Sequence, residues 1–325
     1  MTYSVGSTIL HDDFNIFATG SAGGTATNSG NVNNIWGVGN GNVGWGQSTT
    51  VGAVSSSNSI TATQWSTLTS RINSIRAHQT GTGVSFLNTT GGTSANITAG
   101  QTIKQLSNLS SALSDAYSHC TGTGGVSMIC YTTSGAVTTK STDIGSQTLG
   151  SAGNTTVTYT VAFASYDNAR YFFNAGGYLA LTFSMTNAGT NKTQSWSNLL
   201  SDIGTVTLGG LTTSAPGSSG VFTTINGYSL YSLPGTPTRW FLKYNDTGVA
   251  DYNLNYVDTN ISLSGSTITI SITYADAATD AFGTWPSTPP WRLEDYINYP
   301  AVSNLYVNSP GTAYITNTWG TITVT

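Results

Sequence analysis

One motif occurs twice in this chain, and it constrains the fold more than any other feature. The first copy spans residues 59–83 and ends in His-Gln-Thr-Gly-Thr-Gly. The second spans residues 96–124 and ends in His-Cys-Thr-Gly-Thr-Gly. A fainter echo lies at residues 9–15. Repetition of a whole segment is typical of units that pack against their own copies, so we expect an architectural role for this motif.

Each copy is predicted to form a helix with one apolar face. Apolar residues recur at spacings of three and four in both copies: Trp65, Leu68, Ile72 and Ile75 in the first, and Leu106, Leu109, Leu113 and Ala116 in the second. Because each helix would bury a single stripe, the two are expected to pack as an antiparallel hairpin or against copies in other subunits.

The ends of both helices carry recognisable stop and start signals. Thr61 or Thr63 is the expected N-cap of the first helix, and Thr98 that of the second, because a hydroxyl can accept a hydrogen bond from a free amide of the first turn. Each Thr-Gly-Thr-Gly stretch supplies glycines that can adopt the left-handed conformation in which helices end. A phosphate-binding loop would instead need a Gly-Lys-Ser/Thr sequence before a helix.

The segments on either side of the helix pair have different patterns. Residues 1–58 are rich in Gly, Asn and Ser, and are predicted to be an extended arm that brings Trp36 and Trp45 to a neighbouring subunit. From residue 127 to 325 the pattern alternates with period two, as in residues 155–164, 178–185 and 267–274. Residues 170–177 are predicted to be a strand ending in a turn or bulge, and residues 193–203 a short helix.

These patterns predict an α+β fold that is mostly β. It would comprise an arm (1–58), a repeated helix pair (59–126) and a β-sandwich or jelly-roll-like domain (127–325). Charged residues make up 7% of the chain, against about 25% in an ordinary soluble domain. Such a surface suits a subunit that is covered by neighbours. The formal net charge of −4 gives no electrostatic case for nucleic-acid binding, and no apolar run is long enough to span a membrane.

Candidate chemical groups are few, and we expect no enzymatic activity, metal or cofactor. His78 and His119 occupy matching positions, where a histidine interacts favourably with the negative end of a helix dipole. His11, Asp12 and Asp13 are expected to cap a short helix. Cys120 and Cys130 flank a Gly-rich loop, and free thiols are expected if assembly occurs in the cytoplasm.

One stretch near the C-terminus resembles a sugar-binding arrangement. Two tryptophans, with four acidic residues nearby, offer stacking surfaces for a glycan: Trp285 and Trp291 with Asp276, Asp280, Glu294 and Asp295. Packing and turn roles are the alternative for the same residues. A glycan depolymerase that uses Glu294 is a further alternative, although no spacing selects a catalytic pair of carboxylates.

Five short phrases occur together in this chain, at residues 33–37, 44–48, 60–65, 76–79 and 169–177. In combination they resemble a group of virion structural proteins of marine tailed phages, including cyanophages. That group often has Gly-Tyr-Gly-Gln ahead of a Thr-Ala-x-Gln-Trp helix that ends in His-Gln, and here Trp45 stands where Tyr is commoner. The resemblance implies a particle component, located in the virion, and it implies no active site. Residues 1–4 lack the basic start and apolar stretch of a secretory signal, so we expect synthesis in the host cytoplasm.

The sequence therefore predicts a homo-oligomeric structural protein of a tailed-phage tail, baseplate, neck or fibre, in contact with other virion proteins. Alternatives are a tail-tip protein that binds a receptor or host surface glycan, and a capsid decoration protein. The residues predicted to make subunit contacts are the large apolar side chains of the arm and helices: Trp36, Trp45, Trp65, Leu68, Ile72, Leu106, Leu109 and Leu113.

Overall fold

The chain folds into two compact units. The computed structural model describes residues 10–22, 25–26, 30–48, 51–81, 106–122, 137–143, 154–185, 191–215, 222–245, 253–277 and 301–325. Unit 1 comprises Met1–Ser134, Asp167–Gly177 and Ser309–Gly320, and unit 2 comprises the remainder. This division differs from the predicted one, because the arm and the helix pair belong to a single unit that also takes in two segments from the C-terminal half.

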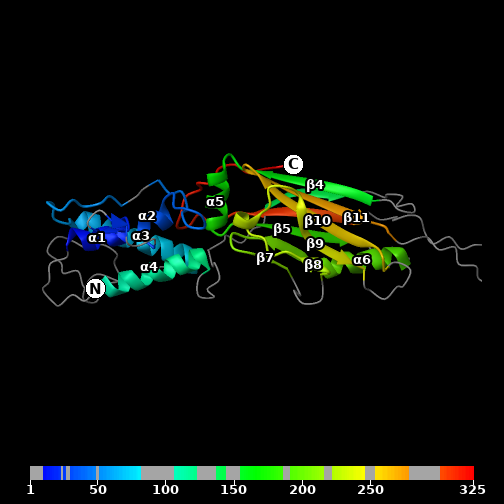
Figure 1. Ribbon diagram of the computed structural model, residues 1–325, viewed down its shortest axis with the longest axis horizontal. Helices are drawn as coiled ribbons and strands as arrows, with labels where there is room; N and C mark the ends of the chain where they lie inside the picture. The colour runs from blue at the N-terminus through cyan, green and yellow to red at the C-terminus, as the bar shows by residue number, and fades with distance from the viewer. Residues whose placement is uncertain are drawn as a thin grey trace, which may run out of the picture. The chain divides into compact units, whose positions relative to one another are not determined.

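Unit 1 is mainly helical. Its elements are α1 (His11–Ala18), the short strands β1 (Ser21–Ala22) and β2 (Thr25–Ala26), α2 (Val32–Trp36), α3 (Ala62–Thr80), α4 (Leu106–Thr121) and nearly all of α5 (Tyr166–Asn174) (Figure 1). The predicted extended arm is corrected. Residues 10–22 and 30–48 pack against the helices, with Phe14 buried and its ring 6.1 Å from that of Trp65.

The start and stop signals of α3 act as predicted. The Thr61 hydroxyl accepts a hydrogen bond from the Gln64 amide, and the Gln64 side chain accepts one from the Thr61 amide, which completes a capping box. The helix ends at Gly81, which has φ 75°. Gly122, after α4, also has a positive φ of 65°. Thr98, the cap predicted for the second helix, lies outside the described residues.

The two repeated helices do not form the predicted antiparallel hairpin. Gln79 Nε2, at the end of α3, donates to the backbone oxygen of Ala116 at 2.8 Å and to Cys120 Sγ at 3.4 Å, both in the last turns of α4. An antiparallel hairpin would place the end of α3 beside the start of α4. Their C-terminal turns lie side by side instead, so α3 and α4 run in the same general direction.

Unit 2 contains two antiparallel sheets. One has the strand order β13-β4-β11-β10-β9-β8 and the other β3-β12-β5-β6-β7. The bounds are β3 (Val137–Asp143), β4 (Asn154–Ala162), β5 (Tyr178–Met185), β6 (Thr205–Leu208), β7 (Thr213–Ser214), β8 (Thr224–Ile225), β9 (Thr238–Tyr244), β10 (Tyr256–Ser264), β11 (Thr267–Ala275), β12 (Ala301–Asn308) and β13 (Thr323–Val324). A 3₁₀ turn, η2 (Leu230–Ser232), precedes β9.

The two sheets pack face to face as a β-sandwich. The Tyr159 hydroxyl of β4 donates to the backbone oxygen of Ser303 of β12 at 2.8 Å. The ring of Phe183, on β5, lies 6.1 Å from Phe241 and 6.4 Å from Tyr274 of the opposite sheet. The prediction of an α+β chain with a β-sandwich is thus confirmed. Period-two alternation identified β4, β5 and β11, whose alternate side chains are buried.

Two helices interrupt the strand pattern. α6 (Asn191–Ile203) was predicted, and its Trp196, Leu199, Leu200 and Ile203 are fully buried. The prediction of a strand over residues 170–177 is wrong, because this segment forms most of α5. Phe172 and Phe173 are buried, and the amides of Gly176 and Gly177 donate back to Phe173 and Phe172, which ends the helix.

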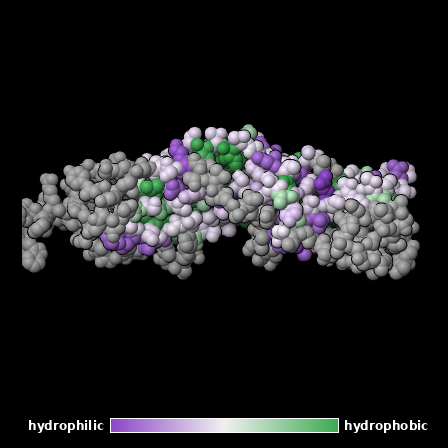
Figure 2. All heavy atoms as spheres, turned by 180° about the vertical axis from the view of Figure 1, so that it is seen from behind, coloured by the Kyte–Doolittle hydropathy of each residue, from purple (hydrophilic) through white to green (hydrophobic). Residues whose placement is uncertain are grey.

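On β4 and β11 the outer face of the larger sheet is lined with hydroxyl groups. Thr156 and Thr273 form a side-chain hydrogen bond of 3.2 Å across β4 and β11, as do Thr158 and Ser271. Figure 2 shows pale shades of intermediate hydropathy over much of the described surface on one side of the molecule. The uncharged composition therefore appears on the folded surface as rows of Thr and Ser.

Candidate functional site

The loop of residues 37–46 has a backbone shape that depends on glycine. Gly39 and Gly44 have φ values of 55° and 98°, a region that residues with a side chain rarely adopt. A Cβ atom at Gly39 would lie 2.4 Å from the Val43 oxygen, and one at Gly44 would lie 2.1 Å from the Val38 oxygen. The loop therefore folds tightly on itself and turns several carbonyl groups in one direction.

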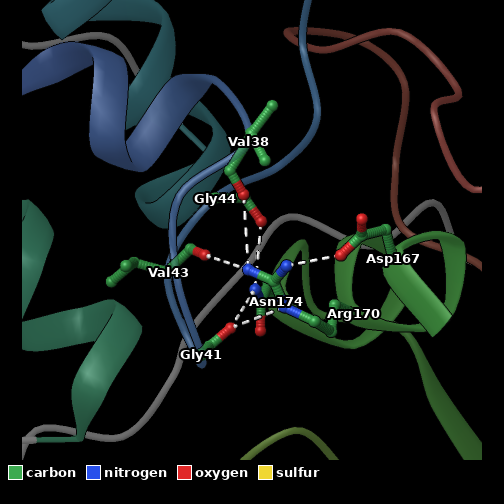
Figure 3. Close-up of polar contacts among 7 residues, drawn as sticks. All are labelled: Val38, Gly41, Val43, Gly44, Asp167, Arg170 and Asn174. Carbon is green, nitrogen blue, oxygen red and sulfur yellow. Dashed lines mark hydrogen bonds and ion pairs between the residues drawn. The ribbon is translucent and has the colours of Figure 1, made fainter.

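Arg170 of α5 binds those carbonyl groups (Figure 3). Its Nε donates to the Gly41 oxygen at 3.2 Å, and its Nη2 donates to the oxygens of Val38 and Val43, each at 3.3 Å. Nη1 forms an ion pair of 2.6 Å with Asp167, one turn earlier on the same helix. The Arg170 side chain is only 9% exposed. A buried guanidinium is thus surrounded by acceptors that its planar fork can reach together.

Asn174 and Trp45 extend this contact between α5 and the loop. Asn174, one turn after Arg170, donates through Nδ2 to the oxygens of Gly41 at 3.2 Å and Gly44 at 3.0 Å. In return, the indole Nε1 of Trp45 donates to the Asn174 backbone oxygen at 3.0 Å. Residues that are 129 positions apart are therefore fixed together by buried polar bonds.

Side-chain amides connect other separated segments of unit 1. We call each such contact a carboxamide bridge. In it, the side chain of an Asn or Gln bonds twice to the backbone of one distant residue: its nitrogen donates to that residue's C=O, and its oxygen accepts from that residue's N–H. Asn15 makes one with Val54, at 2.8 Å for both bonds. Asn33 makes one with Val51, at 2.8 and 2.7 Å. Gln47 makes one with Thr316, at 2.9 and 3.0 Å.

His78 lies beside the same cluster and is uncharged near neutral pH. Its Nε2 is 2.8 Å from the Ala175 oxygen, to which the neutral ring donates, and its ring meets that of Trp45 edge-on at 4.8 Å. Burial disfavours the charged form and lowers the pKa of His78 to about 4, although the hydrogen bond to Ala175 acts in the opposite direction. The sequence predicted that His78 interacts with the negative end of the helix dipole; its ring instead donates to the Ala175 oxygen, outside the helix.

His119 and Cys120 occupy the matching end of α4. His119 Nδ1 lies 2.7 Å from the backbone oxygen of Asp115 and 3.4 Å from Arg76 Nη1 of α3. Cys120 is a free, buried thiol, and burial raises its pKa to about 12. His78 and His119 thus have different surroundings. In the described part of the chain, no group of three or more His, Cys, Asp or Glu could hold a metal ion.

The residues predicted to make subunit contacts lie in the interior of unit 1. Trp45, Trp65, Leu68 and Ile72 are 0% exposed, Leu109 and Leu113 are 1% exposed, and Trp36 is 4% exposed. Side chains covered to this degree by their own chain have no surface left for a neighbour. The prediction is therefore corrected: these residues form the core of unit 1. The Leu106 side chain lies outside the described residues.

The other predicted sites have mixed outcomes. Asp13 accepts a hydrogen bond from the Leu10 amide at 3.0 Å and so caps α1, as expected for the His11-Asp12-Asp13 sequence. Asp276 is buried. The remaining candidates lie outside the described residues: Trp285, Trp291, Asp280, Glu294, Asp295 and Cys130. No described helix is both long and apolar enough to cross a membrane.

Sequence reasoning missed Arg170, Asn174 and the three carboxamide bridges. The spacing of Asp167, Arg170 and Asn174 places all three on one side of a helix, and the glycines that follow are a typical helix stop, so a helix could have been recognised there. No comparable signal marks Asn15, Asn33 or Gln47 among the many amides of this chain.

Comparison with known proteins adds no relative. No protein-family model matches the chain, and neither a curated protein nor a solved structure matches it.

Proposed function

We propose that this chain is a structural component of a tailed-phage virion that associates with itself and packs against neighbouring virion proteins. The observation that carries the proposal is the row of hydroxyl groups that β4 and β11 carry on the outer face of the larger sheet. Thr156, Thr158 and Asn154 on β4 are exposed, and none of the three is charged. A face of this kind can approach another subunit without bringing like charges together or burying an unpaired charge.

The Arg170 cluster supports the same proposal. Its donors are directed at backbone carbonyls of the chain itself, and the neutral His78 ring donates to a backbone oxygen. These polar groups fix distant segments in place. Such internal fixing suits a subunit that must present a constant shape to its neighbours.

The position of the protein in particles tests the proposal. Antibodies against the chain are applied to purified particles of the phage that encodes it, and bound antibody is located by immunogold electron microscopy. We expect labels at regular positions on the particle. A chain that is made during infection but is absent from purified particles would contradict the proposal.

Recognition of a host surface glycan is a second candidate, favoured by an aromatic pair on the same sheet. Tyr244, 39% exposed, lies 5.2 Å from the ring of Tyr256, and Arg239 forms a two-point ion pair with the neighbouring Asp258 at 2.9 and 2.7 Å. The exposed Tyr244 ring could stack on a sugar ring, with the paired polar groups close to the sugar hydroxyls. A glycan array decides: binding that Tyr244→Ala abolishes supports this role, and an array without binding contradicts it.

A further inference from the structure

The sandwich has one long strand edge whose backbone groups are open among the described residues. β4 pairs with β11 along all nine residues, from Asn154 to Ala162. On its other side β13 pairs only at Ala162 and Val161, and the C-terminal Thr325 exchanges backbone hydrogen bonds with Thr160 at 2.9 and 3.1 Å. No backbone partner of Asn154, Thr156 or Thr158 lies on that side in the described structure.

The direction of these groups follows from the antiparallel pattern. In such a ladder the N–H and C=O of one residue point to the same side, and successive residues alternate between the two neighbours. Thr160 points towards β13, because it bonds to Thr325, and Phe163 points towards the β11 side, because its amide donates to Ser266. Asn154, Thr156 and Thr158 therefore point in the same direction as Thr160, away from β11.

The other sheet edges are protected in the ways that natural proteins use against strand pairing. β7, β8 and β13 have two residues each. β3 has seven, but it carries the exposed Lys140 and a register shift opposite Leu305 and Tyr306 of β12. The open part of β4 has no charge, proline or glycine, and its register with β11 is continuous.

We propose that the open edge of β4 pairs with the β4 edge of a second copy of this chain, antiparallel and around a two-fold axis at Thr156. This register sets Thr156 opposite Thr156 of the other copy, and Asn154 opposite Thr158. It is the register that engages all three outward-pointing residues while leaving Thr160 with Thr325. This contact is one specific form of the self-association given under the proposed function, and it rests on that function.

The side chains on this edge are compatible with self-pairing. On the outer face, Thr156 of one copy meets Thr156 of the other, and hydroxyl pairs of this type already occur between β4 and β11 at 3.2 Å. The side chain of Thr160 likewise bonds to that of Thr325. No charged group opposes another. The larger sheet of one copy would join the larger sheet of the other at this edge and form one continuous sheet.

Cysteine crosslinking tests the register. In a hydrogen-bonded antiparallel pair the Cα atoms are about 5.5 Å apart, within disulfide range. Thr156→Cys and, as the matched control, its β11 neighbour Thr273→Cys are each made in the full chain with Cys130→Ser, and both are oxidised mildly. We expect a covalent dimer with Thr156→Cys only, because the two copies of Thr273 would be separated by three strand spacings.

A backbone variant gives an independent readout. Thr158→Pro removes an N–H that points to the open edge and leaves the β4–β11 ladder intact, whereas Thr158→Ala keeps that N–H. Sedimentation at increasing concentration should show self-association at least tenfold weaker for Thr158→Pro than for Thr158→Ala, while both variants keep the parent's circular dichroism spectrum.

The outcomes separate this contact from the proposed function. A chain that is found in particles but gives no Thr156→Cys dimer overturns the β4 contact and leaves the structural role standing. Equal crosslinking of both cysteine variants also overturns it, because that result indicates random collision. A third outcome is that Thr158→Pro unfolds and the parent chain forms no dimer. That result would mean that the edge is covered within one copy, and it also contradicts the proposal.

Discussion

Both units join segments that lie far apart in the sequence, but they use different kinds of hydrogen bond to do so. Unit 2 joins residues far apart in sequence by backbone ladders, such as the nine-residue pairing of β4 with β11. Unit 1 joins its segments largely through side chains: the Arg170 cluster and the three carboxamide bridges. In each bridge one amide group does what a neighbouring strand does in a ladder, since it offers one donor and one acceptor side by side.

The difference predicts how each unit responds to substitution. A ladder distributes its stability over many backbone bonds that no single side chain supplies. A side chain bound to several carbonyls concentrates that role in one residue, and its loss leaves buried acceptors without partners. Unit 1 should therefore be sensitive to single polar substitutions that unit 2 tolerates.

The largest expected effect is at Arg170. Arg170→Met removes the donor to the oxygens of Val38 and Val43 and one of the two donors to the Gly41 oxygen. We expect the free energy of unfolding to fall by about 3–5 kcal/mol. The matched variant Arg239→Met removes an exposed ion pair of unit 2 and should cost about 1 kcal/mol or less. Urea unfolding of both variants measures the two losses of stability. Similar losses would contradict the prediction that unit 1 is the more sensitive to loss of a polar side chain.

Acid should affect unit 1 through His78. The pKa of His78 is about 4 when folded and about 6.5 in the unfolded chain, so the unfolded state binds more protons between these values. Stability should fall as the pH decreases from about 6.5 to about 4, by up to about 3 kcal/mol from this group. His78→Gln should flatten this dependence, and a profile unchanged by His78→Gln would refute the assignment.

A smaller loss is expected at a carboxamide bridge. Gln47→Glu keeps the shape but replaces the donor NH₂ by an oxygen that faces the Thr316 carbonyl, so we expect a loss of about 2 kcal/mol at neutral pH. Gln194→Glu, in the exposed first turn of α6, is the control for the charge itself, with little change expected. Thermal unfolding compares the two variants. Equal melting temperatures would show that the Gln47 bridge adds nothing.

The smallest effect concerns the N-cap of α3. Thr61→Ala removes the hydroxyl that accepts from Gln64, which should cost about 1 kcal/mol. Thr67→Ala changes a residue in the middle of the same helix. It removes a hydroxyl that donates to the Thr63 oxygen of that helix, and the free energy of unfolding should change little. Denaturant midpoints of both variants check the prediction, which fails if Thr67→Ala is the more destabilising.

Much of the fold could be predicted from local sequence patterns. The contacts between residues far apart in the sequence could not. The cap at Thr61, the stop at Gly81, the buried stripe of α3 and the alternation in β4 and β11 follow from neighbours in the sequence, and each is confirmed. The relative direction of α3 and α4 does not follow from such neighbours. It depends on where Gln79 finds its partners, 37 and 41 residues away.

The misjudged residues have a common physical origin. An apolar stripe shows that a side chain needs cover, but the stripe does not show whether the cover comes from the same chain or from another copy. Trp36, Trp45 and Trp65 are covered by their own unit. A polar residue such as Arg170 gives even less indication, because its partners are backbone oxygens that any sequence has.

Hydrogen exchange in the Arg170→Met variant tests the comparison of the two units most directly. Amide exchange is followed by mass spectrometry on peptides of the parent and the variant under native conditions. We predict faster exchange for residues 43–47 and for α5 and α3 in the variant, with the protection of β10 and β11 unchanged. Unchanged protection throughout unit 1, or an equal loss in β10 and β11, would contradict the claim that Arg170 holds unit 1 together.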